Sequence, residues 1–169
     1  MLKSHLEVID QAISLLNELD HNSFTQVLSP YFSGSIGQHL RHVIDHYENL
    51  FEGLAEGFVN YNQRKRFCSV ETSLEACSQA LYNIRSKINA LTSTQLSEAL
   101  SILTEISISE QDDALVASNV ERELVFASSH AIHHYALIKI IRQMQHATVP
   151  AGFGYAPATL TYLRTQNVG

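Results

Sequence analysis

Histidine is the residue type with the most chemistry to offer in this chain, which has 9 histidines among 169 residues. Two short stretches hold most of them: His39, His42 and His46 in the first, and His130, His133 and His134 in the second. A neutral imidazole is a common ligand for transition metals and a common general base. Metal binding and proton transfer are therefore the chemistries that these residues indicate.

Both stretches have the spacing of a helix. At about 100° per residue, the three histidines of the first stretch span an arc of about 60° and share one edge of a helix. In the second stretch, His130 and His134 lie one turn apart, on a stripe that also holds Phe126, Leu137, Ile141 and Met144. Burying an imidazole costs free energy unless both ring nitrogens find partners. A pair one turn apart, joined by a third ring from a facing helix, predicts a metal site with an open coordination position, as in catalytic centres.

Each single histidine also fits a structural role, with hydrogen bonds to the backbone, to Tyr47 or to another histidine.

Other metal architectures match less well. A di-iron carboxylate bundle needs two Glu-x-x-His motifs, and the chain has one, at Glu18–His21. His-Glu-x-x-His and Cys-x-x-Cys are absent. The sequence also allows a haem bound by two histidines, although a third histidine would then have no role.

Two residues are candidates for catalysis, Glu123 and His46. Glu123 lies seven residues before His130 on the same stripe, where a carboxylate can orient a ligand or act as a base. An acid in the first turn of a helix is equally explained by the helix dipole. The nucleophile motif Gly-x-Ser-x-Gly is absent, and residues 34–37 have the pattern of a helix start.

The elements that must position these residues are mainly helices. Apolar residues recur at three- and four-residue steps over 2–20, 35–57, 71–92 and 119–146, which predicts four amphipathic helices. Ser35, and either Thr72 or Ser73, can cap two of them. Alternation around the turn 111–113 favours a short hairpin, although a fraying helix fits the same residues. Residues 158–164 add a last helical turn or two. The prediction is one all-α domain, 1–169, an antiparallel four-helix bundle with a short β-hairpin between the third and fourth helices.

Composition limits the partners and the compartment. With 11 Lys+Arg against 17 Asp+Glu, the formal net charge is −6, which disfavours a nucleic-acid partner. No apolar run approaches the roughly 18–20 residues of a membrane span, so we expect no membrane partner. Cys68 and Cys77, in a chain without a secretory-type start, predict reduced thiols and a cytoplasmic location. The basic stretch Arg64-Lys65-Arg66 is short enough to be a solvated connection.

The stretches Ser35–Tyr47 and His130–Ile138 resemble the DinB-like superfamily, which are bacterial four-helix-bundle metalloproteins. The resemblance implies a divalent ion bound by one histidine of the second helix and by two ligands a turn apart on the last long helix. Carried over to this chain, the ligands are His42, His130 and His134, with His46 and His133 as neighbours. Helix geometry alone favours His39 or His46 over His42, because they lie nearer the centre of the apolar face. We follow the motif and keep His46 as the reserve ligand.

The same resemblance implies a metal-dependent enzyme acting on a small molecule, such as a low-molecular-weight thiol. The ion, which could be Zn, Ni, Fe or Mn, would act as a Lewis acid or activate a thiol or water, for thiol transfer, isomerisation or hydrolysis. The alternative is a non-catalytic helical bundle with structural histidines, or with metal binding and no turnover. A homodimer is a further expectation, with Phe153, Tyr155 and Tyr162 as a candidate partner-facing patch.

Overall fold

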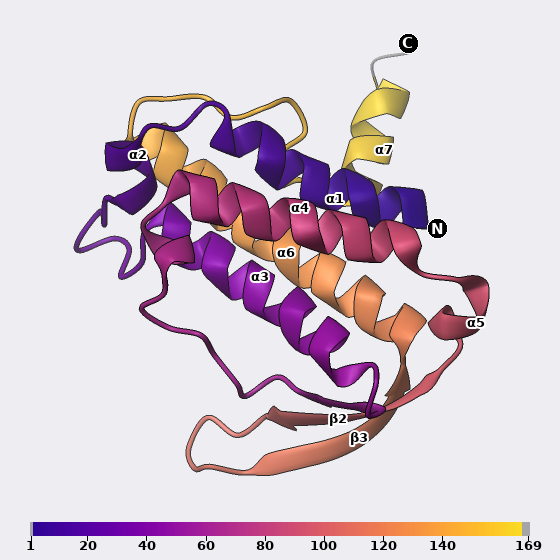
Figure 1. The fold of residues 1–169 in the computed structure, drawn as a ribbon. Coiled ribbons are helices and arrows are strands. Elements are labelled where there is room, and N and C mark those ends of the chain that lie inside the picture. The colour runs from indigo at the N-terminus through magenta and orange to yellow at the C-terminus, as the bar shows by residue number, and fades with distance from the viewer. Residues whose placement is uncertain (1, 167–169) are drawn as a thin grey trace.

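The computed structural model describes residues 2–166, and this part of the chain is mostly helical with a small sheet at one end (Figure 1). The α-helices are α1 (Leu2–Leu16), α2 (His21–Thr25), α3 (Ile36–Gly53), α4 (Leu74–Ala90), α5 (Ser93–Leu96), α6 (Val120–Met144) and α7 (Pro157–Gln166). A 3-10 turn, η1, covers Ser69–Glu71. The strands are β1 (Phe58–Asn60), β2 (Ala99–Glu105) and β3 (Asp113–Asn119).

The four predicted helices are present as α1, α3, α4 and α6. Helix α1 packs on α4 and α6, and α3 packs on the same two helices, so the four long helices enclose one core (Figure 1). The largest fully buried side chains in that core include Tyr47, Tyr135, Phe24 and Phe153. Cys77 lies in the same core as a free, fully buried thiol. The first helix ends earlier than predicted, at Leu16, because Asp20 accepts a hydrogen bond from the Ser23 N–H and opens α2 instead.

Helix starts follow the capping residues of the sequence. Ser35 accepts a hydrogen bond from the Gln38 N–H, and the Gln38 side chain accepts one from the Ser35 N–H, which completes a capping box at the start of α3. Ser73 caps α4 by accepting a hydrogen bond from the Ala76 N–H. Gly37 has a separate role, because a Cβ on it would lie 2.1 Å from the Glu71 carbonyl oxygen. The first turn of α3 therefore packs against η1 at a distance that only glycine allows.

The predicted hairpin is present but belongs to a larger sheet. Strands β2 and β3 are antiparallel, paired from Ala99 with Asn119 to Glu105 with Asp113. Strand β1 joins β2 in parallel, and its three residues are too short a segment for alternation to reveal. Because β1 follows α3 and β3 leads directly into α6, the sheet is attached to the two helices that carry the histidines (Figure 1).

Among the described residues, one helix, α6, has the length and apolar composition of a membrane span. The mean hydropathy of its most apolar 18-residue window is 1.2. It packs against α1 and α3, and 44% of that window is buried inside the fold. Its most buried positions are Val120, Leu124, Ala127, Ala131, Tyr135, Ile138 and Ile141. A helix in the core of a fold can have the same length and composition.

The tail after α6 packs partly on its own chain. Phe153 is fully buried and its ring stacks on Tyr135, with ring centroids 4.9 Å apart, so it cannot form part of an exposed partner patch. Tyr155 is about one-third exposed and lies against the Lys139 ammonium, while Tyr162, on α7, is exposed. The expectation for these aromatic residues is therefore wrong for Phe153.

Candidate metal centre

Packing of α3 against α6 brings the two histidine groups together. The ring centroid of His42 lies 5.0 Å from that of His130 and 4.8 Å from that of His134. The His130 and His134 rings are 4.6 Å apart. The three ligands that the resemblance implies are thus mutual neighbours.

His46 belongs to the same group. Its ring centroid is 4.1 Å from that of His130 and 4.8 Å from that of His42. One ligand nitrogen from each of His42, His46 and His130 lies within 4.8 Å of the other two. We call His42, His46, His130 and His134 the histidine cluster. Within the cluster, the imidazoles of His42, His46 and His130 are close enough together for a metal site.

The other two histidines of α3 and α6, His39 and His133, lie at the edge of the cluster. His39 Nδ1 and His134 Nδ1 are 2.9 Å apart and share a hydrogen bond. His133 is exposed, 6.4 Å from His130 between ring centroids. His39 therefore supports His134 from outside the cluster, whereas His133 faces solvent.

Ring nitrogens in and beside the cluster lack partners, which makes the residues a good fit for an ion. Among the described residues, His42 Nδ1, His130 Nε2 and His39 Nε2 are buried and accept or donate no hydrogen bond. Leaving such a group unpaired costs about 1–3 kcal/mol. An ion bound at about 2.0–2.1 Å to imidazole nitrogen would draw the rings closer and give these nitrogens a partner.

Electrostatics keep the cluster in the neutral form that a metal ligand requires. Burial, followed by the charges of the neighbouring rings, lowers the pKa of His42 to about 2 and that of His134 to about 3. The same causes, with burial the largest, lower the pKa of His46 and of His130 to about 4. At neutral pH, none of the four imidazoles has to release a proton before it can bind a cation.

Hydrogen bonds orient two of the rings. His46 Nδ1 lies 3.2 Å from the His42 carbonyl oxygen, and His134 Nδ1 is occupied by His39. In each ring the other nitrogen, Nε2, is left for a ligand. Metal-binding histidines commonly use one nitrogen for the ion and the other for such an orienting hydrogen bond.

A cavity of about 590 Å³ opens beside the cluster, between the helices and the sheet. Its walls include His42, His46, Tyr61, Asn62, Arg64, Arg66, Thr104, Glu105, Ser107, Phe126 and His130. A second cavity, of about 490 Å³, shares His42 and Arg64 with the first. The first cavity has the size of a small-molecule site and reaches His42, His46 and His130 directly.

Glu123 is buried, and its side chain is hydrogen-bonded to a tyrosine and a serine. Its two carboxylate oxygens accept hydrogen bonds from the Tyr61 hydroxyl, at 2.8 Å, and from the Ser118 hydroxyl, at 2.6 Å. Tyr61 in turn stacks on His46, with ring centroids 5.2 Å apart and planes 20° from parallel. Glu123 therefore reaches the site through Tyr61.

Several wall residues could not be identified from the sequence. Tyr61, Arg64 and Arg66 come from the connection after β1, where no periodic pattern marks a function. The stripe of α6 that holds Phe126, His130 and Leu137 is only partly buried, because the core side of the helix is a neighbouring face. The partial exposure of these side chains shows that they line a cavity and are not part of the hydrophobic core.

Comparison with known proteins supports the fold. No family model matches the chain. The structure is similar to that of a DinB-like protein, YjoA, from Bacillus subtilis, with a TM-score of 0.57, 15% identity, and coverage of 88% of this chain and 94% of that one. A segment of 108 residues, which is 64% of this chain, is also 33% identical to FK506-binding protein 5 of Rhizopus delemar. It spans 28% of the length of that relative.

The resemblance noted in the histidine segments is thereby confirmed at the level of the fold. The mostly helical chain with a small sheet fits the fold of the comparison structure. The imidazoles of α3 and α6 that the sequence motif singled out lie together at one cavity. The chain has the DinB-like fold.

Proposed function

We propose that the histidine cluster binds one divalent metal ion through His42, His130 and His134. The observation that carries this proposal is the pair of buried ring nitrogens without partners among the described residues, His42 Nδ1 on α3 and His130 Nε2 on α6, because both residues line the cavity. The second-helix histidine and the last-helix pair follow the DinB-like motif. His46, whose nitrogen also lies within reach of His42 and His130, is the reserve ligand.

The bound ion would supply Lewis-acid chemistry, lowering the pKa of a thiol or water that enters the cavity. Under this assignment His46 stays unligated and accepts the proton that the thiol or water releases, because its ring lies on the cavity wall. Tyr61 holds the plane of His46 by stacking, and the Tyr61 hydroxyl is itself fixed on Glu123. Phe126, 5.8 Å from His46 between ring centroids, borders the same wall.

The activity that we infer is metal-dependent thiol transfer, isomerisation or hydrolysis on a small molecule, with a low-molecular-weight thiol as the leading substrate class. Zn, Ni, Fe and Mn are the candidate ions, since imidazole ligands suit several of them. We place the protein in the cytoplasm, as a homodimer without a nucleic-acid or membrane partner. We also describe its four long helices as an antiparallel bundle, a description supported by the pairwise packing of α1 and α3 on α4 and α6.

A non-catalytic role is the second candidate. Two observations favour it: His39 and His134 share a hydrogen bond, and the rings of His46 and His130 stack, so these imidazoles contact one another without any ion. In that case the cluster is structural, or it stores a metal without turnover.

Metal content separates these candidates. The untagged protein is incubated with Zn, Ni, Mn or Fe salts, dialysed and measured by elemental analysis, beside His130→Ala, His134→Ala and the double variant. We expect about one ion per chain in the wild type and a loss in all three variants. The exposed neighbour His133→Ala is the matched control and should keep its ion. Circular dichroism checks that each variant is folded.

A wild-type protein that retains none of these ions would overturn the metal proposal. If the ion is retained, and panels of thiol and hydrolase substrates show no turnover above that of the double variant, the non-catalytic candidate is favoured.

A further inference from the structure

The basic segment Arg64-Lys65-Arg66 lies at the mouth of the site. Arg64 and Arg66 both line the cavity that contains His42, His46 and His130, and Arg64 also lines the second cavity. The lysine between them is used differently, because its ammonium is paired with Glu48, at 2.9 Å, and with Glu52, at 2.7 Å, on α3. Of these three consecutive basic residues, the two arginines line the cavity, whereas the lysine pairs with glutamates of α3.

The segment is held in place by contacts that do not use the two arginine side chains. The Asn49 side chain donates to the Gln63 carbonyl oxygen at 2.9 Å, and the Phe67 N–H donates to Glu71 Oε1 at 3.2 Å. Glu71 is itself fixed by the buried Arg41 guanidinium, which donates to the same carboxylate oxygen at 2.9 Å. The backbone on either side of the arginines is therefore anchored to α3 and η1, while their charged ends remain available.

No carboxylate of the described residues forms an ion pair with Arg64 or Arg66, whereas Arg41, Lys65 and Arg85 are all paired. Glu105 is the one acidic side chain on the wall of the first cavity. With its imidazoles neutral, the wall carries two positive charges against one negative charge. A cavity with this balance attracts an anion.

Arg64 lies beside the histidine cluster. It lines the first cavity together with His42, His46 and His130, and it lines the second cavity together with His42. An anionic group held by Arg64 therefore lies within reach of the atom that would react at the cluster.

We propose that Arg64 and Arg66 bind an oxyanion group, a carboxylate or a phosphate, of the small molecule that reacts at the histidine cluster. The assignment rests on the proposed function for the reaction, and it narrows the substrate class to small anions. Guanidinium groups suit this role because their planar donors match the two oxygens of a carboxylate or phosphate. Bound to the arginines, the anion also offsets their repulsion of a cation, so anion and metal should strengthen the binding of each other.

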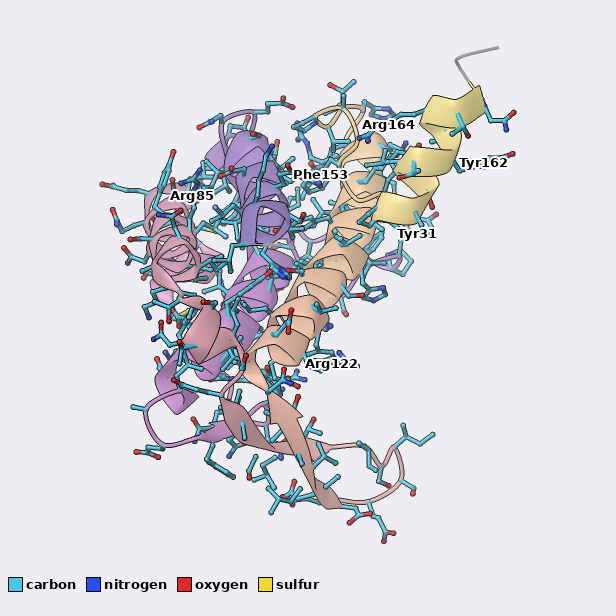
Figure 2. All side chains as sticks on the ribbon, turned by 90° about the vertical axis from the view of Figure 1, so that its right-hand side faces the viewer. Tyr31, Arg85, Arg122, Phe153, Tyr162 and Arg164 are labelled. Carbon is cyan, nitrogen blue, oxygen red and sulfur yellow. The ribbon has the colours of Figure 1, made fainter. Side chains whose placement is uncertain are left out.

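The test compares two ligands that differ in charge alone, 3-mercaptopropionate and its neutral amide, 3-mercaptopropionamide. Both are titrated into the Co²⁺-loaded protein, with the cobalt absorption spectrum as the readout. We expect the wild type to bind the acid about tenfold tighter than the amide, the size of one charge-assisted contact at an open site. The double variant Arg64→Gln/Arg66→Gln should bind the two ligands within about twofold of each other. Arg164→Gln is the matched control, since that exposed arginine lies on α7, at the end of the molecule away from the sheet (Figure 2).

A second measurement does not depend on the metal. Sodium propionate is titrated into the metal-free protein and followed by the NMR signals of the arginine Nε–H groups. Movement of the Arg64 and Arg66 signals, with no movement on addition of propionamide, supports the proposal. Glu105→Gln should increase propionate affinity by about two- to threefold, because it removes a like charge from the wall.

Equal binding of acid and amide to the cobalt-loaded wild type would overturn the anion site and leave the metal proposal intact. Failure to load cobalt would instead count against the metal proposal, and the propionate titration alone would then decide the anion site. Static arginine signals throughout that titration would overturn it.

Discussion

The rings of His46 and His130 lie nearly parallel, with planes 12° apart and centroids 4.1 Å apart, although 84 positions separate the two residues in the chain. His46 belongs to α3 and His130 to α6. The contact joins a reserve ligand to a predicted one, and it places both on the wall of one cavity. Which of these rings binds an ion and which moves a proton is the first question that experiment can answer.

His46→Gln tests that division of roles. If His46 is a base and not a ligand, the variant should keep about one ion per chain, while turnover falls by about 100-fold, the lower range for loss of a general base. Elemental analysis and turnover are measured on the same preparation. Loss of the ion from His46→Gln, with retention in His134→Ala, would instead make His42, His46 and His130 the ligand set.

Acid should destabilise the metal-free protein before most carboxylates are protonated. The folded-state pKa of His46 and His130 is about 4, below the ordinary value of 6.5, so the unfolded chain binds more protons between these limits. Stability therefore falls as the pH drops from 6.5 towards 4, by at most about 1.4 kcal/mol per pH unit for each group. Urea unfolding at pH 7.5, 6.5, 5.5 and 5.0 measures the slope. His130→Phe, which removes one of these groups, should show a shallower dependence, and an identical slope would contradict this origin.

Tyr61→Phe removes the hydroxyl that donates to Glu123 and leaves that buried carboxylate with Ser118 as its partner. Loss of one partner from a buried charged group costs about 1–3 kcal/mol. Urea unfolding of the variant should show this decrease in the free energy of unfolding. Tyr82→Phe is the control, because Tyr82 is 51% exposed and has no hydrogen bond among the described side chains. A loss equal to that of the control would show that the Tyr61 hydroxyl contributes nothing.

Arg41→Met should be far more costly than a similar change at the surface. Arg41 is buried and bonds both Asp45, at 2.6 Å, and Glu71, at 2.9 Å, so its removal leaves two buried carboxylates without a countercharge. Breaking a buried ion pair from one side costs about 3–5 kcal/mol.

The matched control for that change is Arg85→Met, which breaks the more exposed pair with Asp10 and should cost at most about 1 kcal/mol. Equal losses for the two variants, measured by urea unfolding, would contradict this difference. Because Glu71 also fixes the Phe67 N–H, Arg41→Met should weaken binding of 3-mercaptopropionate as well.

Local features of the fold were predictable because neighbouring residues encode them. The periodic apolar residues predicted α1, α3, α4 and α6, and Ser35 predicted the start of α3, since a cap needs only the N–H groups two or three residues further on. The hairpin followed from alternation around its turn. Helix α2, helix α5 and strand β1 were missed, because each is too short to show a period.

The candidate site was predictable only in part. The spacing of His42, His130 and His134 showed that each could face a neighbouring helix, but helical spacing cannot state which helices are neighbours. Tyr61, Arg64 and Arg66 carried no such pattern, and the basic segment had the composition of a solvated connection. Their place on the cavity wall depends on how β1 pairs with β2 and on how α3 anchors the connection.

By itself, the amino-acid sequence determined the types of the long elements, their caps, and the placing of imidazoles on one edge of two helices, because these properties depend on residues within a few turns. Only the tertiary structure decided that α3 and α6 face each other and that His46 joins the cluster. It also decided that Glu123 bonds Tyr61 and Ser118. Such contacts join residues far apart in the chain, and they form when burial of the whole core selects one packing of the helices.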